Sequence, residues 1–191
     1  QVFLKNYMSP NTPYNGVLIF HSTGVGKTCT TVSIVEQYKQ FVTSPSKKMI
    51  ILTGETIRDN FKNEIFKTDL IKSNSDFKKY KTDSMILKQC TKNEYLRYID
   101  DFYDKDHFKS AIDKIRNQYY EMKGYIKFGN EIVKEEFNIG NKLIDLCRCP
   151  ENNITIDNIC EYCIKVNLQI RNFIKKKYSN RILIIDEAHN I

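Results

Sequence analysis

A glycine-rich run near the start of the chain has the residue types of a phosphate-binding loop. Glycines allow the backbone to turn with positive φ, so that successive N–H groups can point at phosphate oxygens. In such a loop Lys27 reaches the β- and γ-phosphates of a nucleotide, and the hydroxyl of Thr28 binds Mg²⁺. The candidate nucleotide-binding residues are therefore Thr23, Gly24, Val25, Gly26, Lys27 and Thr28.

The surroundings of this run support the interpretation. A chance Gly-x-Gly-Lys-Thr on a surface loop is the alternative, but the run lies between an apolar segment, Val17 to Phe20, and an amphipathic segment from Lys27 to about Val42. A strand followed by a helix is the setting that directs a helix N-terminus at a bound phosphate. His21 stands where the general pattern has glycine, and we expect it to be structural rather than catalytic.

An acidic motif follows another apolar run near the end of the chain. The run from Ile182 to Ile185 is followed by Asp186 and Glu187. An aspartate at such a strand end can hold Mg²⁺, and the adjacent glutamate can polarise an attacking water. By itself this pair is often only a solvated strand end. Together with Lys27 and Thr28 it supplies the metal-binding and general-base groups that hydrolysis of a nucleoside triphosphate requires.

Three short apolar runs are expected to form the sheet that positions these residues, at 17–20, 49–52 and 182–185. Each is apolar on both faces, as are parallel strands that helices cover on both sides. After the second run, a turn at Thr53 and Gly54 should lead into a helix through about residue 66. The sequence thus predicts an α/β fold with a parallel sheet flanked by helices.

Residues 67–180 predict a mainly helical insertion between the second and third strands. Thr91 and Glu94 have the spacing of a capping box, which should open a helix. The expected domain organisation is an ATP-binding domain at 1–66 and 181–191, interrupted by this insertion. The helices expected within it run from Thr91 to about Phe102, from Phe108 to Met122 with its end at Gly124, and from near Asp157 to Lys177.

The six cysteines are too few and too clustered for a disulfide scaffold, so a reducing compartment is expected. Four of them have a spacing that could hold a tetrahedral, structural zinc ion. One pair is C-x-C rather than the usual C-x-x-C, and buried or idle thiols are the alternative. The candidate zinc ligands are Cys147, Cys149, Cys160 and Cys163.

Composition narrows the function only slightly. Lysine and arginine outnumber aspartate and glutamate by 30 to 23, which gives a formal net charge of +7. This excess suits a polyanionic partner, although an ordinary solvated surface is the alternative. No apolar run approaches the roughly 18 residues of a membrane span, so no membrane partner is expected. The absence of an Asn-Lys-x-Asp motif disfavours GTP as the nucleotide.

Two motifs resemble those of superfamily 2 helicases. Asp186-Glu187-Ala188-His189 resembles the DEAH form of their motif II, and the run from Thr23 to Thr28 resembles their motif I. Residues 49–54 resemble motif Ia, which in that family contacts the nucleic-acid backbone. The run from Phe3 to Leu18, leading into His21, is similar to the helicase-like ATPases of nucleocytoplasmic large DNA viruses, including those of poxviruses and asfarviruses.

The resemblance covers residues 1–66 and 181–191 and implies a RecA-like P-loop fold that binds and hydrolyses ATP with Mg²⁺. In the family a histidine of motif II couples the nucleotide site to the nucleic acid, and a glutamine upstream of motif I reads adenine. The residues that these roles select here are Lys27, Asp186, Glu187 and His189 for catalysis, Thr28 and Asp186 for Mg²⁺, and Gln1 for adenine.

The resemblance further implies an ATP hydrolase that translocates on or unwinds nucleic acid, DNA in preference to RNA, in viral transcription or replication. Subunits of a viral RNA polymerase or transcription factor are implied as partners, and the host cytoplasm, its viral factory and the virion as locations. Two alternatives stay open. One is a translocase that remodels a transcription complex without separating strands, and the other is a nucleotide-binding interaction scaffold.

In the family, motif III and a second RecA-like domain would follow residue 191. The strand that carries motif III would lie between the strands of motifs I and II. We therefore expect these 191 residues to be part of a longer ATPase, with an incomplete RecA-like sheet. We also expect them to be inactive on their own.

Overall fold

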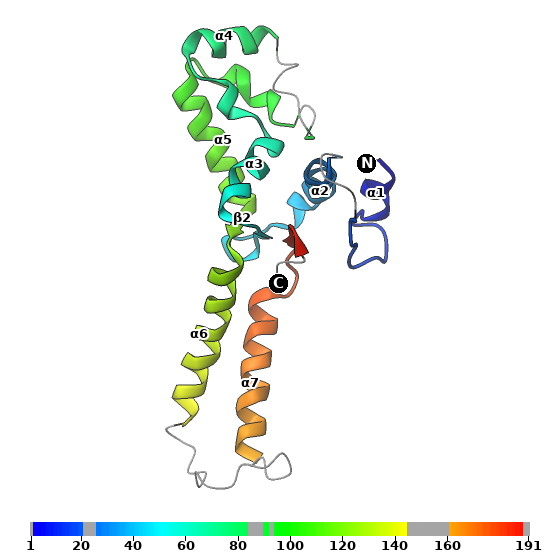
Figure 1. Cartoon of the computed structure of the whole chain (residues 1–191), viewed down its shortest axis with the longest axis vertical. Coiled ribbons are helices and arrows are strands. Elements are labelled where there is room, and N and C mark those ends of the chain that lie inside the picture. The colour runs from blue at the N-terminus through cyan, green and yellow to red at the C-terminus, as the bar shows by residue number, and fades with distance from the viewer. Residues whose placement is uncertain (1, 21–25, 84–89, 92–93, 145–160, 189–191) are drawn as a thin grey trace.

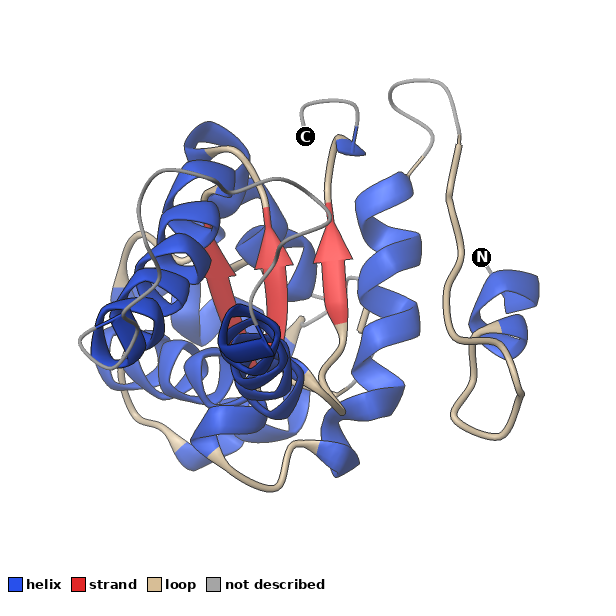
Figure 2. Ribbon diagram, turned by 90° about the horizontal axis from the view of Figure 1, so that it is seen from below, coloured by secondary structure: helices blue, strands red, loops and turns tan. Residues whose placement is uncertain are grey.

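The computed structural model describes residues 2–20, 26–83, 90–91, 94–144 and 161–188, and gives only the backbone of 135–144 and 161–166. The fold is α/β, as expected, and its sheet consists of three parallel strands in the order β2-β1-β3 (Figure 2). The strands are β1 (Met49–Leu52), β2 (Tyr120–Lys123) and β3 (Leu183–Ile185). Among the described helices, none is long and apolar enough to cross a membrane.

Helices make up most of the rest of the described chain. The α-helices are α1 (Val2–Tyr7), α2 (Lys27–Val35), α3 (Glu55–Ile65), α4 (Asn74–Thr82), α5 (Lys105–Tyr119), α6 (Tyr125–Ile144) and α7 (Glu161–Tyr178). Short 3-10 helices are η1 (Glu36–Phe41), which continues α2, η2 (Pro45–Lys47), η3 (Thr68–Leu70) and η5 (Leu96–Asp101).

The central strand β1 is buried along its whole length, and its residues are at most 3% exposed. It pairs in parallel with β2, where Met49 lies opposite Tyr120, and with β3, where Ile50 lies opposite Leu183. A strand that is apolar on both faces needs a cover on both faces, which explains why helices surround this short sheet. Because all three strands are parallel, their carboxyl ends meet at one edge.

The molecule is elongated, with the sheet near its middle (Figure 1). The α6–α7 hairpin, two antiparallel helices, projects to one side of the sheet, while α4 and most of α5 lie on the opposite side. The core extends from the sheet into the α3–α5 region, where buried aromatic rings of Phe66, Phe77 and Phe108 have centroids 5.3 to 5.9 Å apart. The expected insertion therefore shares one core with the sheet.

Several expected elements form where the sequence places them. The helix expected from Lys27 to about Val42 corresponds to α2 and η1, and the helix expected after Gly54 corresponds to α3. The strand expected at 49–52 is β1. The last expected helix corresponds to α7, although residues 157–160 lie outside the described part.

The expected strand at 17–20 is wrong. This segment is extended but pairs with no described strand, and it lies on the side of α2 away from the sheet (Figure 2). Leu18 is 80% exposed and Phe20 is 92% exposed. A strand needs a neighbour to satisfy its N–H and C=O groups, and the described residues place no free strand edge beside this one.

The helix expected from Phe108 to Met122 is also wrong at its end. The chain leaves the helix after Tyr119 and forms β2 over Tyr120–Lys123. Parallel pairing with β1 supplies the backbone hydrogen bonds that a longer helix would have supplied. The division into a domain and an insertion remains a prediction, but this strand of the 67–180 segment belongs to the same sheet as β1 and β3.

The helix expected from Thr91 to Phe102 is replaced by a later and shorter one, the 3-10 helix η5. The predicted capping residues have other partners. The hydroxyl of Thr91 donates to the carbonyl of Ile65 at 2.9 Å, and the carboxylate of Glu94 accepts from Arg97. A tertiary contact thus takes the Thr91 hydroxyl, and a local i,i+3 ion pair takes the Glu94 carboxylate, so neither group caps a helix. The long helix α6 was not anticipated.

Candidate nucleotide-binding site

The start of α2 has the backbone of a phosphate-binding turn. Gly26 has a φ of 81°, in the left-handed region that favours glycine. Its carbonyl accepts hydrogen bonds from the amide and the hydroxyl of Thr30, at 3.0 and 3.1 Å. The N-cap residue Gly26 has no side chain to cap this helix N-terminus, so a phosphate is a suitable partner for its first-turn N–H groups. Of the predicted loop, residues 23–25 lie outside the described part.

The acidic pair, Asp186 and Glu187, lies at the carboxyl edge of the sheet. The amide of Asp186 donates to the carbonyl of Leu52 at 2.9 Å, which attaches the pair to the end of β1. The carboxylate of Asp186 accepts from the hydroxyl of the buried Thr53. Glu187 has a φ of 52°, a conformation that non-glycine residues rarely adopt and that clusters at functional sites.

Lys27 and the acidic pair are brought together from opposite ends of the chain. The ammonium nitrogen of Lys27 lies 4.0 Å from a carboxylate oxygen of Glu187, and both side chains remain about one-third exposed, at 31% and 34%. The positive charge of Lys27 also acts on Asp186, where it favours the ionised carboxylate. The structure therefore places an ammonium group, two carboxylates and a helix N-terminus at one site.

The two carboxylates oppose each other electrostatically. Partial burial raises the pKa of Asp186, and the negative charge of Glu187 raises it further. A backbone hydrogen bond from Glu187, the charge of Lys27 and the hydroxyl of Thr53 act in the other direction without cancelling the shift. A site that accumulates negative charge in this way gains from a divalent cation. The residues present thus fit a nucleotide with Mg²⁺.

Tyr125 is part of this site, and sequence reasoning missed it. Its hydroxyl donates a hydrogen bond to the main-chain carbonyl of Asp186. Burial raises the pKa of Tyr125, and the charges of Asp186 and Glu187 raise it further. Tyr125 follows β2, so the unrecognised strand is what brings it to the carboxyl edge.

A groove lies beside the site, at the carboxyl ends of β1 and β2. It has a volume of about 730 Å³ and is lined by α3, by the first turns of α6 and by the turns that precede them. One of its acidic groups is already paired, since Glu131 binds Lys123, which lies outside the lining. The lining residues used below are Gly54, Arg58, Tyr125, Lys127, Asn130 and Lys134.

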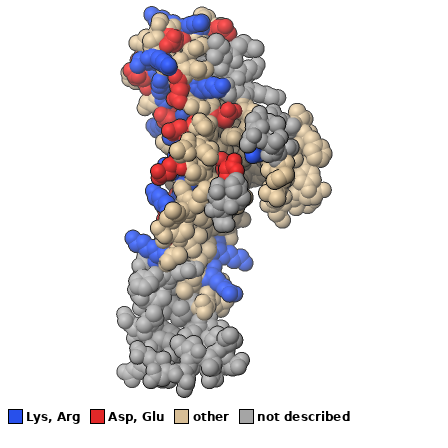
Figure 3. Space-filling model, in the orientation of Figure 1, with Lys and Arg blue, Asp and Glu red and all other residues tan. Residues whose placement is uncertain are grey.

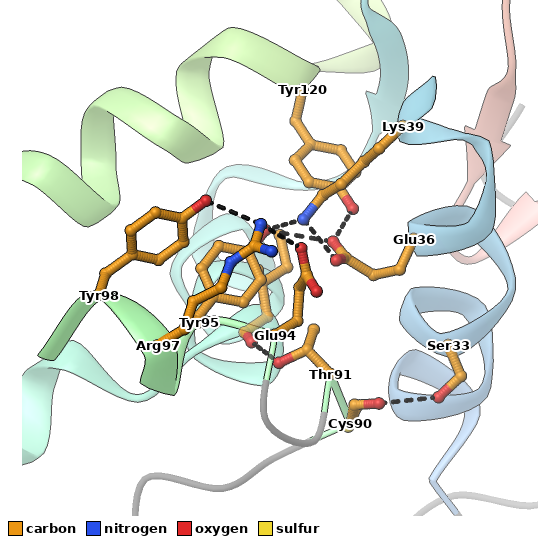
Figure 4. A network of polar contacts seen from close by, with 11 residues as sticks. Ser33, Glu36, Lys39, Cys90, Thr91, Glu94, Tyr95, Arg97, Tyr98 and Tyr120 are labelled. Carbon is orange, nitrogen blue, oxygen red and sulfur yellow. Dashed lines mark hydrogen bonds and ion pairs between the residues drawn. The ribbon is translucent and has the colours of Figure 1, made fainter. Parts of the chain in front are cut away.

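A buried polar network joins the helix that follows the phosphate-binding turn to the predicted insertion (Figure 4). The carboxylate of Glu36 pairs with Lys39 and accepts hydrogen bonds from the hydroxyls of Tyr95 and Tyr120. Burial lowers the pKa of Lys39 despite the attraction of Glu36, and burial also raises the pKa of both tyrosines. The network anchors η1 to β2 and to the residue that precedes η5.

A disulfide connects the same two regions. Cys29, in the first turn of α2, is bonded to Cys90, with their Cα atoms 5.1 Å apart. The carboxylate of Glu64 lies 3.1 Å from the sulfur of Cys90. Sequence reasoning missed this bond, because the two cysteines are 61 positions apart and belong to no spacing pattern.

Other predicted residues carry no structural support here. Gln1, His189 and the candidate zinc ligands Cys147, Cys149 and Cys160 lie outside the described part, as does the side chain of Cys163. The zinc prediction is therefore unsupported. An acidic run around Asp104 is a helix cap rather than a metal cluster, since the Asp104 carboxylate accepts from the amides of Asp106 and His107 at the start of α5.

Comparison with known proteins gives three informative relatives. "Putative ATP-dependent RNA helicase L377" of Acanthamoeba polyphaga mimivirus is 30% identical over the whole chain. "Putative helicase 087L" of Invertebrate iridescent virus 3 is 27% identical over the whole chain. The "Early transcription factor large subunit homolog" of African swine fever virus (isolate Tick/Malawi/Lil 20-1/1983) is 23% identical over the whole chain.

The chain spans only 15% of the length of the first two relatives and 19% of the third. No family model matches the chain. No solved structure matches it either.

Proposed function

Because the chain is homologous to helicase-like proteins of large DNA viruses, we propose that it is the ATP-binding domain of a superfamily 2 nucleic-acid-dependent ATPase. The observation that supports this most directly is the 4.0 Å approach of Lys27 to Glu187, which joins the two predicted halves of a nucleotide site. In this proposal the three-stranded sheet is part of a RecA-like P-loop fold, with 67–180 inserted into the domain formed by 1–66 and 181–191.

ATP binds at the N-terminus of α2 in this proposal. The turn around Gly26 and the first-turn N–H groups hold the phosphates, while Lys27 exchanges its contact with Glu187 for the β- and γ-phosphates. Thr28 and Asp186 hold Mg²⁺, which neutralises charge that develops on the phosphoryl oxygens. Once Lys27 contacts the phosphates, the carboxylate of Glu187 orients and deprotonates the attacking water.

The groove beside the site holds the nucleic acid. Three lining residues carry positive charge, Arg58, Lys127 and Lys134, against two acidic ones, Glu55 and Glu131, and Gly54 lines the same groove. On the face shown in Figure 3, the charged side chains visible on the described parts of α6 and α7 are lysines and arginines. Positively charged side chains along a groove are what binding of the phosphate backbone of a nucleic acid requires. We place DNA before RNA, and a comparison of both ligands decides between them.

The whole protein in this proposal is longer than this chain and works in viral transcription or replication, in the host cytoplasm and in the virion, with polymerase or transcription-factor subunits as partners. Its second RecA-like domain supplies the arginine that completes the site, so the 191 residues alone are inactive. A translocase that remodels a transcription complex without separating strands is the second candidate, favoured by the similarity to an early transcription factor subunit homolog. Strand displacement measured beside ATP hydrolysis separates the two.

The test is ATP turnover by the full-length protein carrying Glu187→Gln. We expect kcat to fall about 10²–10⁴-fold, the usual contribution of a general base, with ATP binding retained. Asp101→Asn is the matched control, because this carboxylate is exposed on η5 and distant from the site in sequence and fold. Unchanged turnover in Glu187→Gln would reject the enzymatic proposal and leave the nucleotide-binding scaffold.

A further inference from the structure

Tyr125 touches both the groove and the acidic pair. It is the first residue of α6 and follows β2 and Gly124 directly. It lines the groove, and its hydroxyl donates to the carbonyl of Asp186. The Tyr125 side chain therefore contacts both the groove, where the nucleic acid would lie, and the backbone of the acidic pair.

The carbonyl that Tyr125 binds belongs to the peptide group between Asp186 and Glu187. The orientation of this peptide group sets the direction in which Glu187 leaves the backbone, and Glu187 has the unusual φ of 52°. A non-glycine residue held in this region is strained, so surrounding contacts must hold it there. The bond from the Asp186 amide to Leu52 holds one side of Asp186, and the Tyr125 hydroxyl holds the other.

The hydroxyl of Tyr125 is a dependable donor. A phenol hydroxyl is a donor at neutral pH, and here its acceptor is the main-chain carbonyl of Asp186. The groove cations that lie on the same helix are Lys127 and Lys134, two and nine residues after Tyr125 along α6. A strand that binds these cations must also contact or displace the start of α6, where Tyr125 is placed.

We propose that Tyr125 is a positioning residue through which nucleic acid in the groove sets the orientation of Glu187 and thereby activates ATP hydrolysis. This inference rests on the proposed function and adds its route of regulation. Binding of a strand shifts the start of α6, the hydroxyl of Tyr125 carries the shift to the Asp186 carbonyl, and the peptide group turns Glu187 toward the attacking water.

The test compares Tyr125→Phe with wild type in the full-length protein, because this change removes only the hydroxyl. We expect kcat at saturating single-stranded oligonucleotide to fall about tenfold, the effect of one lost hydrogen bond in the active arrangement. The KM for ATP and the Kd for the oligonucleotide should be unchanged. Tyr103→Phe is the matched control, since Tyr103 is 95% exposed and lies away from the groove lining.

A second measurement does not depend on hydrolysis. Hydrogen exchange of the peptide 183–188 should change when the oligonucleotide binds wild type, and should not change in Tyr125→Phe. Stimulation equal to wild type, or a raised Kd with unchanged kcat, would overturn the inference, because Tyr125 would then be only part of the groove wall. A wild-type protein with no oligonucleotide-stimulated hydrolysis would instead reject the proposed function, so the two failures are distinguishable.

Discussion

The ammonium group of Lys27 lies 4.0 Å from the carboxylate of Glu187, although the first residue opens α2 and the second follows β3. The two elements are not hydrogen-bonded to each other. β3 pairs with β1 in the sheet, and α2 packs beside the sheet (Figure 2). The pairing is a consequence of parallel topology, which collects strand ends and helix N-termini at one edge. In the proposed site the positive charge of Lys27 therefore lies beside the negative charge of Glu187 before a nucleotide binds.

Lys27→Ala should weaken ATP binding. A lysine on phosphate oxygens contributes a charge-assisted contact, so its loss should raise the Kd for ATP about 10–100-fold. Binding of a fluorescent ATP analogue to the full-length protein measures this effect. Lys78→Ala, an exposed lysine on α4, is the control and should bind ATP as wild type does. Equal affinity in Lys27→Ala would show that ATP binds elsewhere.

Asp186→Asn should stabilise the fold at neutral pH while it abolishes ATP hydrolysis. The pKa of Asp186 is raised in the folded state, so the folded protein holds this proton more tightly than the unfolded chain does. Stability from this group is therefore present below the unfolded pKa, near 3.8, and is lost as pH rises through the folded pKa.

Thermal melting at neutral and acidic pH measures this prediction for Asp186→Asn. The variant should melt at a higher temperature than wild type at neutral pH. The difference should shrink in acid, where the Asp186 carboxyl of wild type becomes neutral like the amide of the variant. A variant that melts at a lower temperature at neutral pH would show that the carboxylate stabilises the fold, contrary to the direction of its pKa.

Reduction of the Cys29–Cys90 disulfide should destabilise the chain. A cross-link between positions 61 apart removes loop entropy from the unfolded state worth about 4 kcal/mol in the chain-entropy model. Urea unfolding with and without reductant measures the loss. In the double variant Cys29→Ser, Cys90→Ser, the free energy of unfolding should be the same with and without reductant. Thiol counting that finds both cysteines free in the oxidised protein would contradict the bond.

Glu36→Ala should be strongly destabilising, by about 3 kcal/mol, because it leaves the largely buried charge of Lys39 without its carboxylate partner. Adding Lys39→Met should recover much of this loss, since the second change removes the orphaned charge. Urea unfolding of the two single variants and the double variant forms the cycle. Strictly additive losses would mean that the pair in Figure 4 is not coupled.

Substituting the groove cations should weaken nucleic-acid binding. Arg58→Ala, Lys127→Ala and Lys134→Ala should each lower affinity with little dependence on base sequence. Each lost phosphate contact should reduce the slope of log Kd against log salt by about 1. Lys78→Ala on α4 is again the matched control. If all three groove variants keep the wild-type slope, the strand binds another surface.

The nucleotide site could be predicted in part because its signals are local. Gly26 must take positive φ in a tight turn, and the residues after it form a helix, so the type and order of neighbours are enough to predict α2. The same holds for β1, where four consecutive apolar residues require burial on both faces. Local chemistry did not predict Tyr125, because nothing in its neighbourhood points to the Asp186 carbonyl.

The errors have a common cause in long-range pairing. Tyr120–Lys123 reads as a helix end, yet it is a strand because β1 offers a free edge. Residues 17–20 read as a strand, yet they are unpaired because no described edge lies beside them. Strand formation depends on a partner distant in sequence, whereas a helix satisfies its own backbone.

The sequence by itself determined which groups are available for chemistry, namely the phosphate-binding turn, Lys27 and the acidic pair, and it was enough to predict the helices that follow Gly26 and Gly54. Only the tertiary structure decided that β2 joins the sheet, that the groove opens beside it, and that Tyr125, Cys29 and Glu36 acquire their partners. The physical reason is that hydrogen bonds within one turn depend on adjacent residues, while side-chain partners in a core depend on how the whole chain packs.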